Sequence, residues 1–259
     1  MANATNPTAC LLVIGNEVLS GRTADANIRF LATRLGELGI PLREVRVIPD
    51  VAGTIVTTLN EVRARFDHVF TTGGIGPTHD DITSECVAAA FGVPWEKHPE
   101  AWARLEEYYL RTRGDLSEFN PPRQRMATMP RGAILIDNAV SIAPGFTIGN
   151  VHVMAGVPRI MQSMFDTLAS RLAGGPPIVS AAVHATGMAE GRIADGLAAV
   201  QGRYPGLDIG SYPYYRTGAN GVAIVAKGND PQAAAAAIAE VTALMQALDG
   251  NPVQGEPPM

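Results

Sequence analysis

The chain has 259 residues, of which 46% are hydrophobic, and a formal net charge of −5. This length allows one large domain or a large and a small one, and the acidic balance argues against sequence-independent nucleic-acid binding. No segment approaches the roughly 20 apolar residues of a membrane span. The two cysteines, Cys10 and Cys86, form no metal or disulfide pattern, so we expect a cytoplasmic protein without a membrane partner.

Apolar strands and amphipathic helices alternate over the first part of the chain. A strand followed by a helix occurs three times over residues 9–92. A further helix and a Pro- and Gly-rich excursion then precede the last strand and helix of this part. The predicted strands are 9–15, 41–50, 67–74 and 150–156, and the predicted helices are 25–39, 53–66, 81–92, 98–113 and 158–172. This order predicts an α/β fold, with a doubly wound, mostly parallel sheet covered by helices on both faces.

The stretch "AGGPP" (173–177) indicates a boundary, because the order of elements changes after it. A strand, a helix, two strands and a helix follow, which predicts a second, smaller α+β domain. We therefore expect an α/β domain over 8–175, a small domain over 176–250 and a disordered tail over 251–259.

The stretch "TTGGIGPTHDD" (71–81) joins the end of a predicted strand to the start of a predicted helix. Glycines at such a corner let a ligand approach the backbone, and the N–H groups there bind anions. The loop is neither a GxGxxG motif nor a P-loop, since it has no lysine. We expect the amides of Gly73, Gly74 and Gly76 to bind a phosphate, with hydroxyl donors from Thr72 and Thr78.

Two aspartates, Asp80 and Asp81, close this loop. A carboxylate about 4 Å from a phosphate charge costs on the order of 4 kcal/mol at an effective dielectric constant near 20, and a divalent cation between them reverses the sign. Mg²⁺ binds one or two carboxylates together with phosphate oxygens. We therefore expect Asp80 and Asp81 to hold Mg²⁺ or another divalent metal. The simpler alternative is that one of them only caps the helix that begins near Ile82.

Further candidates follow other strands of the predicted sheet. Glu17 and Asn16 come directly after the first strand, and Glu17 is either a catalytic group in the same crevice or an ordinary surface residue. Ser141 and Gly145 in "NAVSIAPGF" and Gly156 in "MAGVPRI" are possible phosphate or heterocycle contacts, although a structural turn explains the first segment equally well. The chain has no GxSxG, HExxH or CxxC pattern, which leaves metal-assisted chemistry without a protein nucleophile.

Four segments together, "GNEVLSGRTADANIRFLATRLGELGI", "TTGGIGPTHDDIT", "SIAPGF" and "IGSYPYY", resemble one family. It is the molybdopterin-binding (MoCF biosynthesis) domain family, in the branch found at the amino terminus of the competence/damage-inducible protein CinA. In related molybdenum-cofactor enzymes the glycine loop holds the pterin or its adenylated form. The CinA-like branch is associated with divalent-metal-dependent hydrolysis of ADP-ribose and related nucleotide pyrophosphates, and its eukaryotic relatives with FAD hydrolysis.

The resemblance implies a hydrolase, a metal-dependent nucleotide pyrophosphatase in which Asp80, Asp81 and Glu17 serve catalysis. Three alternatives stay open, namely a molybdopterin-binding protein without hydrolysis, a molybdopterin adenylyltransferase, and a non-enzymatic subunit. Asn16 stands where the family often has Asp, which removes one carboxylate, and the carboxyl-terminal deamidase domain of full-length CinA is not expected here. Relatives usually self-associate, so the resemblance also implies a homo-oligomer, either a dimer or a trimer.

Overall fold

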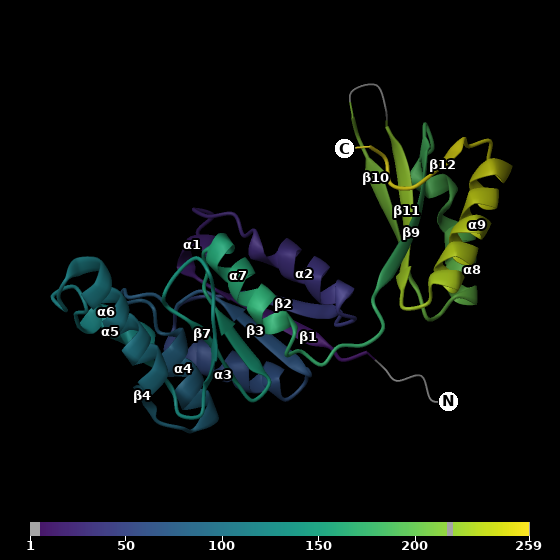
Figure 1. The fold of residues 1–259 in the computed structure, drawn as a ribbon. Coiled ribbons are helices and arrows are strands. Elements are labelled where there is room, and N and C mark those ends of the chain that lie inside the picture. The colour runs from purple at the N-terminus through teal and green to yellow at the C-terminus, as the bar shows by residue number, and fades with distance from the viewer. Residues whose placement is uncertain (1–5, 217–219, 259) are drawn as a thin grey trace. The chain divides into compact units, whose positions relative to one another are not determined.

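The structure is a computed structural model that describes residues 6–216 and 220–258. The chain divides into two compact units, Met1–Gly175 and Pro176–Met259, shown in Figure 1. Two core clusters belong to the first unit and one to the second, so that each unit has its own buried core. The division falls between Gly175 and Pro176.

A six-stranded sheet forms the centre of the first unit. Its order is β2 (Leu42–Ile48), β1 (Ala9–Ile14), β3 (His68–Thr72), β8 (Val151–Met154), β7 (Gly145–Ile148) and β6 (Ile134–Ile136). Neighbours from β2 to β8 pair in parallel, whereas β7 pairs antiparallel with β8 and with β6. The predicted, mostly parallel sheet is therefore confirmed, with β1 between β2 and β3.

Helices cover both faces of this sheet, and successive side chains of β1 point alternately into the two cores between sheet and helices. Leu11 and Val13 belong to the cluster that includes α2 (Asn27–Glu37) and α7 (Pro158–Ala169). Leu12 and Ile14 belong to the cluster that includes α3 (Ala52–Arg63) and α4 (Thr83–Phe91). All six residues of β1 are buried, as expected of a central strand covered on both sides.

The excursion between α4 and β6 has its own small elements. These are β4 (Trp95–Lys97), α5 (Pro99–Arg113), α6 (Pro121–Gln124), a 3₁₀ turn (Arg125–Ala127) and β5 (Thr128–Pro130), which pairs antiparallel with β4. A one-turn helix α1 (Asn16–Leu19) follows β1 and was not predicted, since four residues are too few to show helical periodicity.

The second unit is an antiparallel sheet with two long helices. Its elements are β9 (Val179–Thr186), a 3₁₀ turn (Glu190–Arg192), α8 (Ala194–Arg203), β10 (Asp208–Tyr214), β11 (Gly221–Gly228), α9 (Pro231–Ala247) and β12 (Pro252–Gln254), in the sheet order β10-β11-β9-β12. Asp230 caps α9 by accepting from the N–H groups of Gln232 and Ala233, and α8 and α9 pack on one face of the sheet (Figure 1).

The expected disordered tail is wrong over Pro252–Gln254, which forms β12. This strand pairs antiparallel with β9, and Gly255 N–H donates to Ala182 O at 2.8 Å. The physical reason is that β9 would otherwise be an edge strand with unpaired backbone groups, which the tail satisfies. Residue 259 lies outside the described residues.

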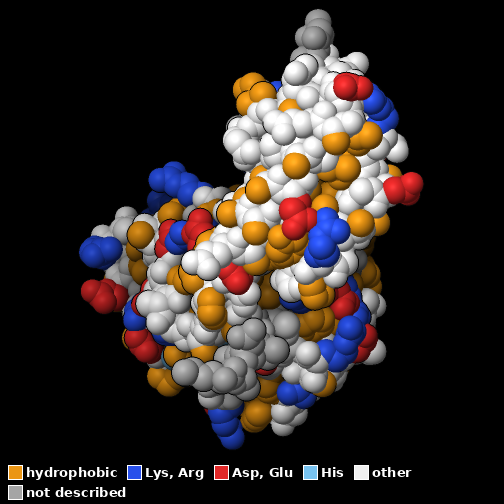
Figure 2. Space-filling view, turned by 90° about the vertical axis from the view of Figure 1, so that its right-hand side faces the viewer, with side chains coloured by type: hydrophobic (Ala, Val, Ile, Leu, Met, Phe, Trp, Pro, Cys, Tyr) orange, Lys and Arg blue, Asp and Glu red, His pale blue; other side chains and the backbone are white. Residues whose placement is uncertain are grey.

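No helix among the described residues is long and apolar enough to cross a membrane. On the face shown in Figure 2, Lys and Arg side chains lie among Asp and Glu side chains and do not gather into a basic patch.

Candidate functional site

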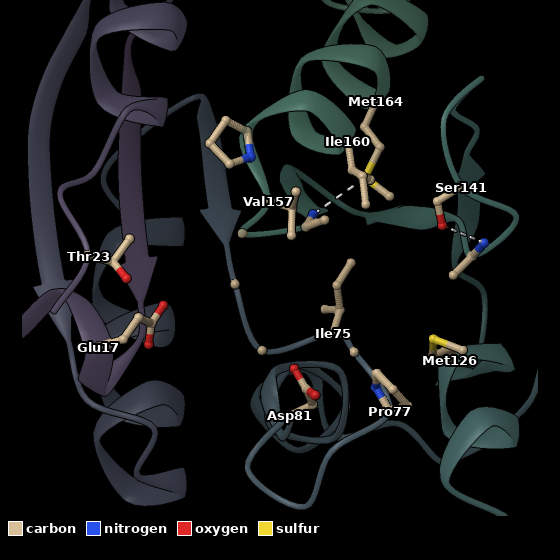
Figure 3. Close-up of a pocket in the computed structure, with 17 residues that line it drawn as sticks. Glu17, Thr23, Ile75, Pro77, Asp81, Met126, Ser141, Val157, Ile160 and Met164 are labelled. Carbon is tan, nitrogen blue, oxygen red and sulfur yellow. Dashed lines mark hydrogen bonds between the residues drawn. The ribbon is translucent and has the colours of Figure 1, made fainter.

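A pocket of about 520 Å³ lies in the first unit, and three loops that follow β1, β3 and β8 contribute to it. This is the edge of a parallel sheet where ligands generally bind. The excursion, the loop between β6 and β7, and α7 supply the rest of the wall (Figure 3). The lining residues are Glu17, Thr23, Gly73, Gly74, Ile75, Gly76, Pro77, Asp81, Met126, Ser141, Ala143, Ala155, Gly156, Val157, Pro158, Ile160 and Met164.

The glycine loop has its shape because two of its residues must be glycine. Gly73 and Gly74 have φ values of 104° and 67°, in the region that side chains disfavour. A Cβ on Gly73 would collide with the Ile14 carbonyl oxygen, and one on Gly74 with the Thr83 hydroxyl. The loop therefore packs closely against the end of β1 and the start of α4, and its glycines line the pocket.

The loop amides are not equally available. Gly73 N–H donates to Met154 O at 3.2 Å, which continues the pairing of β3 with β8. The expectation that this amide binds a phosphate is therefore wrong. The N–H groups of Gly74, Ile75 and Gly76 have no hydrogen-bond partner within the described part of the chain, which leaves them for a ligand.

Two carboxylates belong to the pocket, that of Glu17 from α1 and that of Asp81 from the loop before α4 (Figure 3). Each is folded against a glycine. A Cβ on Gly15 would lie 2.5 Å from both carboxylate oxygens of Glu17, and one on Gly76 would lie 2.7 Å from Asp81 Oδ2. The missing side chains of Gly15 and Gly76 thus give these carboxylates their positions.

Asp80 and Asp81 do not cap α4. The N-cap residue of this helix is Ile82, and no side-chain hydrogen bond caps its first turn. Asp81 Oδ2 accepts from Thr78 N–H at 2.8 Å, and the Thr78 hydroxyl contacts both Asp81 Oδ2 and Asp80 Oδ1, the latter at 2.6 Å. The Thr78 hydroxyl is the main cause that lowers the pKa of Asp80. Asp80 and Thr78 do not line the pocket, and Thr78 serves these carboxylates instead of a phosphate.

The residues fit a metal only in part. No group of three His, Cys, Asp or Glu side chains that could hold a metal ion occurs among residues 6–216 and 220–258. However, Mg²⁺ in nucleotide sites commonly uses one or two carboxylates, with water and substrate phosphates as its other ligands. Glu17 and Asp81 can serve in this way, as side chains that face a ligand-sized pocket.

The other predicted residues are divided between the pocket and the core. Ser141 and Gly156 line the pocket, and Ser141 Oγ accepts from Ala143 N–H at 3.2 Å. Thr72 is buried at the end of β3 and does not line it, while Asn16 is exposed and uses its N–H to donate to Asp50 at 2.8 Å.

Gly145 is a structural residue and does not line the pocket. It starts β7, and a Cβ there would collide with the Val153 carbonyl oxygen of the neighbouring strand. The prediction that Gly145 contacts a ligand therefore has no support in its position, since close approach of two strands already requires glycine.

Sequence reasoning missed the apolar wall of the pocket. Its side chains are Ile75, Pro77, Met126, Val157, Ile160 and Met164, and Met164 Sδ accepts a weak bond from Ala155 N–H at 3.4 Å. The loops that the sequence analysis singled out contain Ile75, Pro77 and Val157, so these three could have been predicted to line the pocket. Met126 carried no signal, because the excursion brings it in from far along the chain.

Comparison with known proteins agrees with this geometry. A family model described as "Probable molybdopterin binding domain" matches residues 10–174, the span that holds the sheet and the pocket. The chain belongs to the molybdopterin-binding domain family. The second unit is matched over residues 178–251 by the model of "FAD synthase, middle domain".

Relatives of this molybdopterin-binding domain protein occur in archaea and bacteria. A protein of Pyrobaculum arsenaticum is 36% identical over 213 residues, which is 79% of either chain. A CinA-like protein of Anaeromyxobacter sp. (strain K) is 39% identical over 152 residues, which is 57% of this chain and 36% of that protein. The crystal structure of CinA from Thermoplasma acidophilum, of unknown function, has a TM-score of 0.59 and 29% identity and covers 65% of this chain and 99% of that one. The predicted family and its CinA-like branch are confirmed.

Proposed function

We propose that this chain is a divalent-metal-dependent hydrolase of nucleotide pyrophosphates of the ADP-ribose or FAD type. The observation that carries the proposal is the composition of the pocket. It joins free loop amides to two carboxylates, and no Lys, Arg or His is among its lining residues. A polyanion bound to the loop would be repelled by Glu17 and Asp81 unless a cation balanced them.

The parts of the pocket suit the parts of such a substrate. The N–H groups of Gly74, Ile75 and Gly76 would donate to phosphate oxygens, and the apolar wall around Ile160 and Met164 would pack against a flat base. Asp81, with Asp80 beside it, would hold the cation, and Glu17 would orient a water. A bound divalent cation would polarise the pyrophosphate and lower the pKa of water. The match of the second unit to an FAD synthase domain supports the FAD type of substrate.

Substrate turnover provides the test of this function. The purified protein is incubated with ADP-ribose or FAD and with Mg²⁺, Mn²⁺ or Co²⁺, and mononucleotide release is measured. We expect Asp81→Asn to reduce turnover at least ~100-fold, since charge but not shape is lost. Asp195→Asn, which changes an exposed carboxylate of the second unit, is the control and should leave turnover unchanged. Full turnover by Asp81→Asn would refute the proposal.

Molybdopterin binding without hydrolysis is the second candidate. The family of residues 10–174 and the apolar wall favour it, because a pterin ring also needs a flat apolar surface. Calorimetry with molybdopterin and with ADP-ribose separates the two functions, and an adenylyltransferase would form product only with both ATP and the pterin. A homo-oligomer, dimer or trimer, is part of this proposal, and light scattering tests it.

A further inference from the structure

A small cavity of about 50 Å³ lies beside the pocket. It is lined by the end of β1, α1, the loop before α2, the end of β3, and the loop that leads from β8 into α7. It shares Glu17, Thr23, Gly156 and Pro158 with the pocket. Each of its polar side chains carries an oxygen atom. They are Glu17, Thr23, Asp25, Asn27 and Thr72.

Asn27, the first residue of α2, has an unpartnered oxygen. The residue is 3% exposed, and its Nδ2 donates to the Gly156 carbonyl oxygen at 2.8 Å. This bond fixes the orientation of the amide, since the opposite orientation would place two oxygens in contact. Asn27 Oδ1 is then left buried without a hydrogen-bond partner, a state that proteins avoid.

Thr72 adds a second unpartnered oxygen to the same cavity. The residue is 1% exposed, and its hydroxyl has no hydrogen-bond partner. Thr71, its neighbour in β3, is equally buried and also has an unpartnered hydroxyl, but it does not line the cavity. Two buried, unpartnered oxygens on one polar cavity indicate that a ligand belongs there.

The charges around the cavity decide the kind of ligand. Glu17 and Asp25 supply two carboxylates, and only Asp25 Oδ1 is engaged, by Ile28 N–H at 2.8 Å. No Lys, Arg or His lines the cavity among the described residues. The amino end of α2 carries about half a positive charge. This offsets only part of the negative charge of the two carboxylates. A water would satisfy the acceptors but would leave this negative charge unbalanced.

We propose that this side cavity binds a hard divalent cation through oxygen atoms of Asp25, Asn27, Thr72 and Glu17. Such ions bind carboxylate, amide and water oxygens. The inference deepens the proposed function, because it assigns a cation site on the β1 side of the pocket, apart from Asp81. Glu17 would contact this cation and the substrate pocket together.

The test measures Mn²⁺ binding by electron paramagnetic resonance on the protein without nucleotide. We expect Thr72→Val and Asp25→Asn to weaken Mn²⁺ binding at least ~10-fold, since each removes one oxygen ligand or its charge. Thr71→Val, which removes an equally buried hydroxyl away from the cavity, is the matched control and should bind as wild type does. Asp25→Asn changes a partly exposed residue, so it serves if Thr72→Val fails to fold.

Thermal unfolding gives a second readout. Without metal, both valine variants should be at least as stable as wild type, because each removes an unpartnered buried hydroxyl. With Mn²⁺, wild type and Thr71→Val should gain stability, whereas Thr72→Val should gain little. Equal Mn²⁺ responses of the two valine variants would overturn the inference.

Asp81→Asn separates this inference from the proposed function. It should keep Mn²⁺ bound at the side cavity while it loses nucleotide hydrolysis. If instead Asp81→Asn abolishes Mn²⁺ binding and Asp25→Asn does not, the cation site is at Asp81 and the inference fails. If Mn²⁺ binds at the side cavity and wild type hydrolyses no nucleotide, the proposed function fails and the cation site stands.

Discussion

Gly15 and Gly76 each leave space for a carboxylate, and this makes their substitution informative. We expect Gly15→Ala to lower hydrolysis while it changes the free energy of unfolding by less than ~1 kcal/mol. Its φ of 168° suits any residue, but the new methyl would displace the flexible carboxylate of Glu17, whose oxygens lie 2.5 Å from that position. Gly53→Ala, where nothing lies within 4 Å, is the control. Unchanged turnover by Gly15→Ala would show that the Glu17 position is not important.

Gly74 combines a left-handed backbone with a crowded position, and Gly92 has the first property alone. Their φ values are 67° and 64°, but only Gly74 faces a side chain, that of buried Thr83. We expect Gly92→Ala to lower the free energy of unfolding by about 1–2 kcal/mol, and Gly74→Ala to lose about 1–3 kcal/mol more through overpacking. Urea unfolding of both variants measures the difference. Equal losses would mean that the loop can move away from Thr83.

At the scale of single residues, the sequence indicated which loop contributes to the site but not which hydrogen bonds its atoms make. The sequence placed Glu17 directly after the first strand and Asp81 in the loop after the third, and both line the pocket. It could not show that Gly73 N–H pairs with Met154 O or that Thr78 turns to its own aspartates. These details depend on which strand lies alongside and how the loop folds back, and neither is a local property of the sequence.

At the scale of elements, β8 carries a buried histidine in a directed chain of hydrogen bonds. His152 Nδ1 lies 3.0 Å from Thr147 Oγ1, its Nε2 lies 3.2 Å from His68 Nδ1, and His68 Nε2 lies 3.1 Å from Ala173 O. Ala173 O can only accept, so a neutral His68 donates to it through Nε2 and accepts at Nδ1 from His152 Nε2. His152 Nδ1 then accepts from the Thr147 hydroxyl. Burial, and then the charges of His68 and Arg171, lower the pKa of His152 to about 3.

The low pKa of His152 makes stability depend on pH. The folded protein disfavours the protonated ring of His152. The contribution of the neutral ring to the free energy of unfolding is therefore complete above the ordinary histidine pKa near 6.5, and it is lost as the pH falls from 6.5 toward 3. We expect wild type to lose roughly 1 kcal/mol per pH unit between pH 6 and 5 from this group. His152→Gln should reduce that slope, as measured by urea unfolding at each pH. The same slope in both proteins would contradict the assignment.

Long periodic elements were the most predictable. The central strand β1 and the helices α2, α7 and α9 follow from their apolar patterns, and the alternation of strand and helix predicted the parallel sheet. The short α1 and β12 could not be predicted, because three or four residues carry no period and β12 exists only through its pairing with β9. The excursion was recognised by its Pro and Gly content, but its approach to the pocket through Met126 depends on packing between distant segments.

At the scale of the whole molecule, all pocket residues lie before residue 165, within the unit that ends at Gly175. Gly175 N–H donates to Leu38 O at 3.1 Å, so this unit includes the glycines of the predicted boundary. We expect residues 1–175 alone to fold and to bind ADP-ribose with an affinity within a few-fold of the full chain, since its core is separate. Circular dichroism and calorimetry test this. A folded fragment that cannot bind would assign the second unit a part in the site.

The place of β12 also has a consequence for how the protein is made. The first unit has every strand it needs once the ribosome has passed residue 175, and it can fold while translation continues. The small sheet is different, because β9, its first strand to emerge, gains its second neighbour from Pro252–Gln254, its last. Completion of the second unit therefore waits until β12 has left the exit tunnel, and until then β9 keeps one side unpaired.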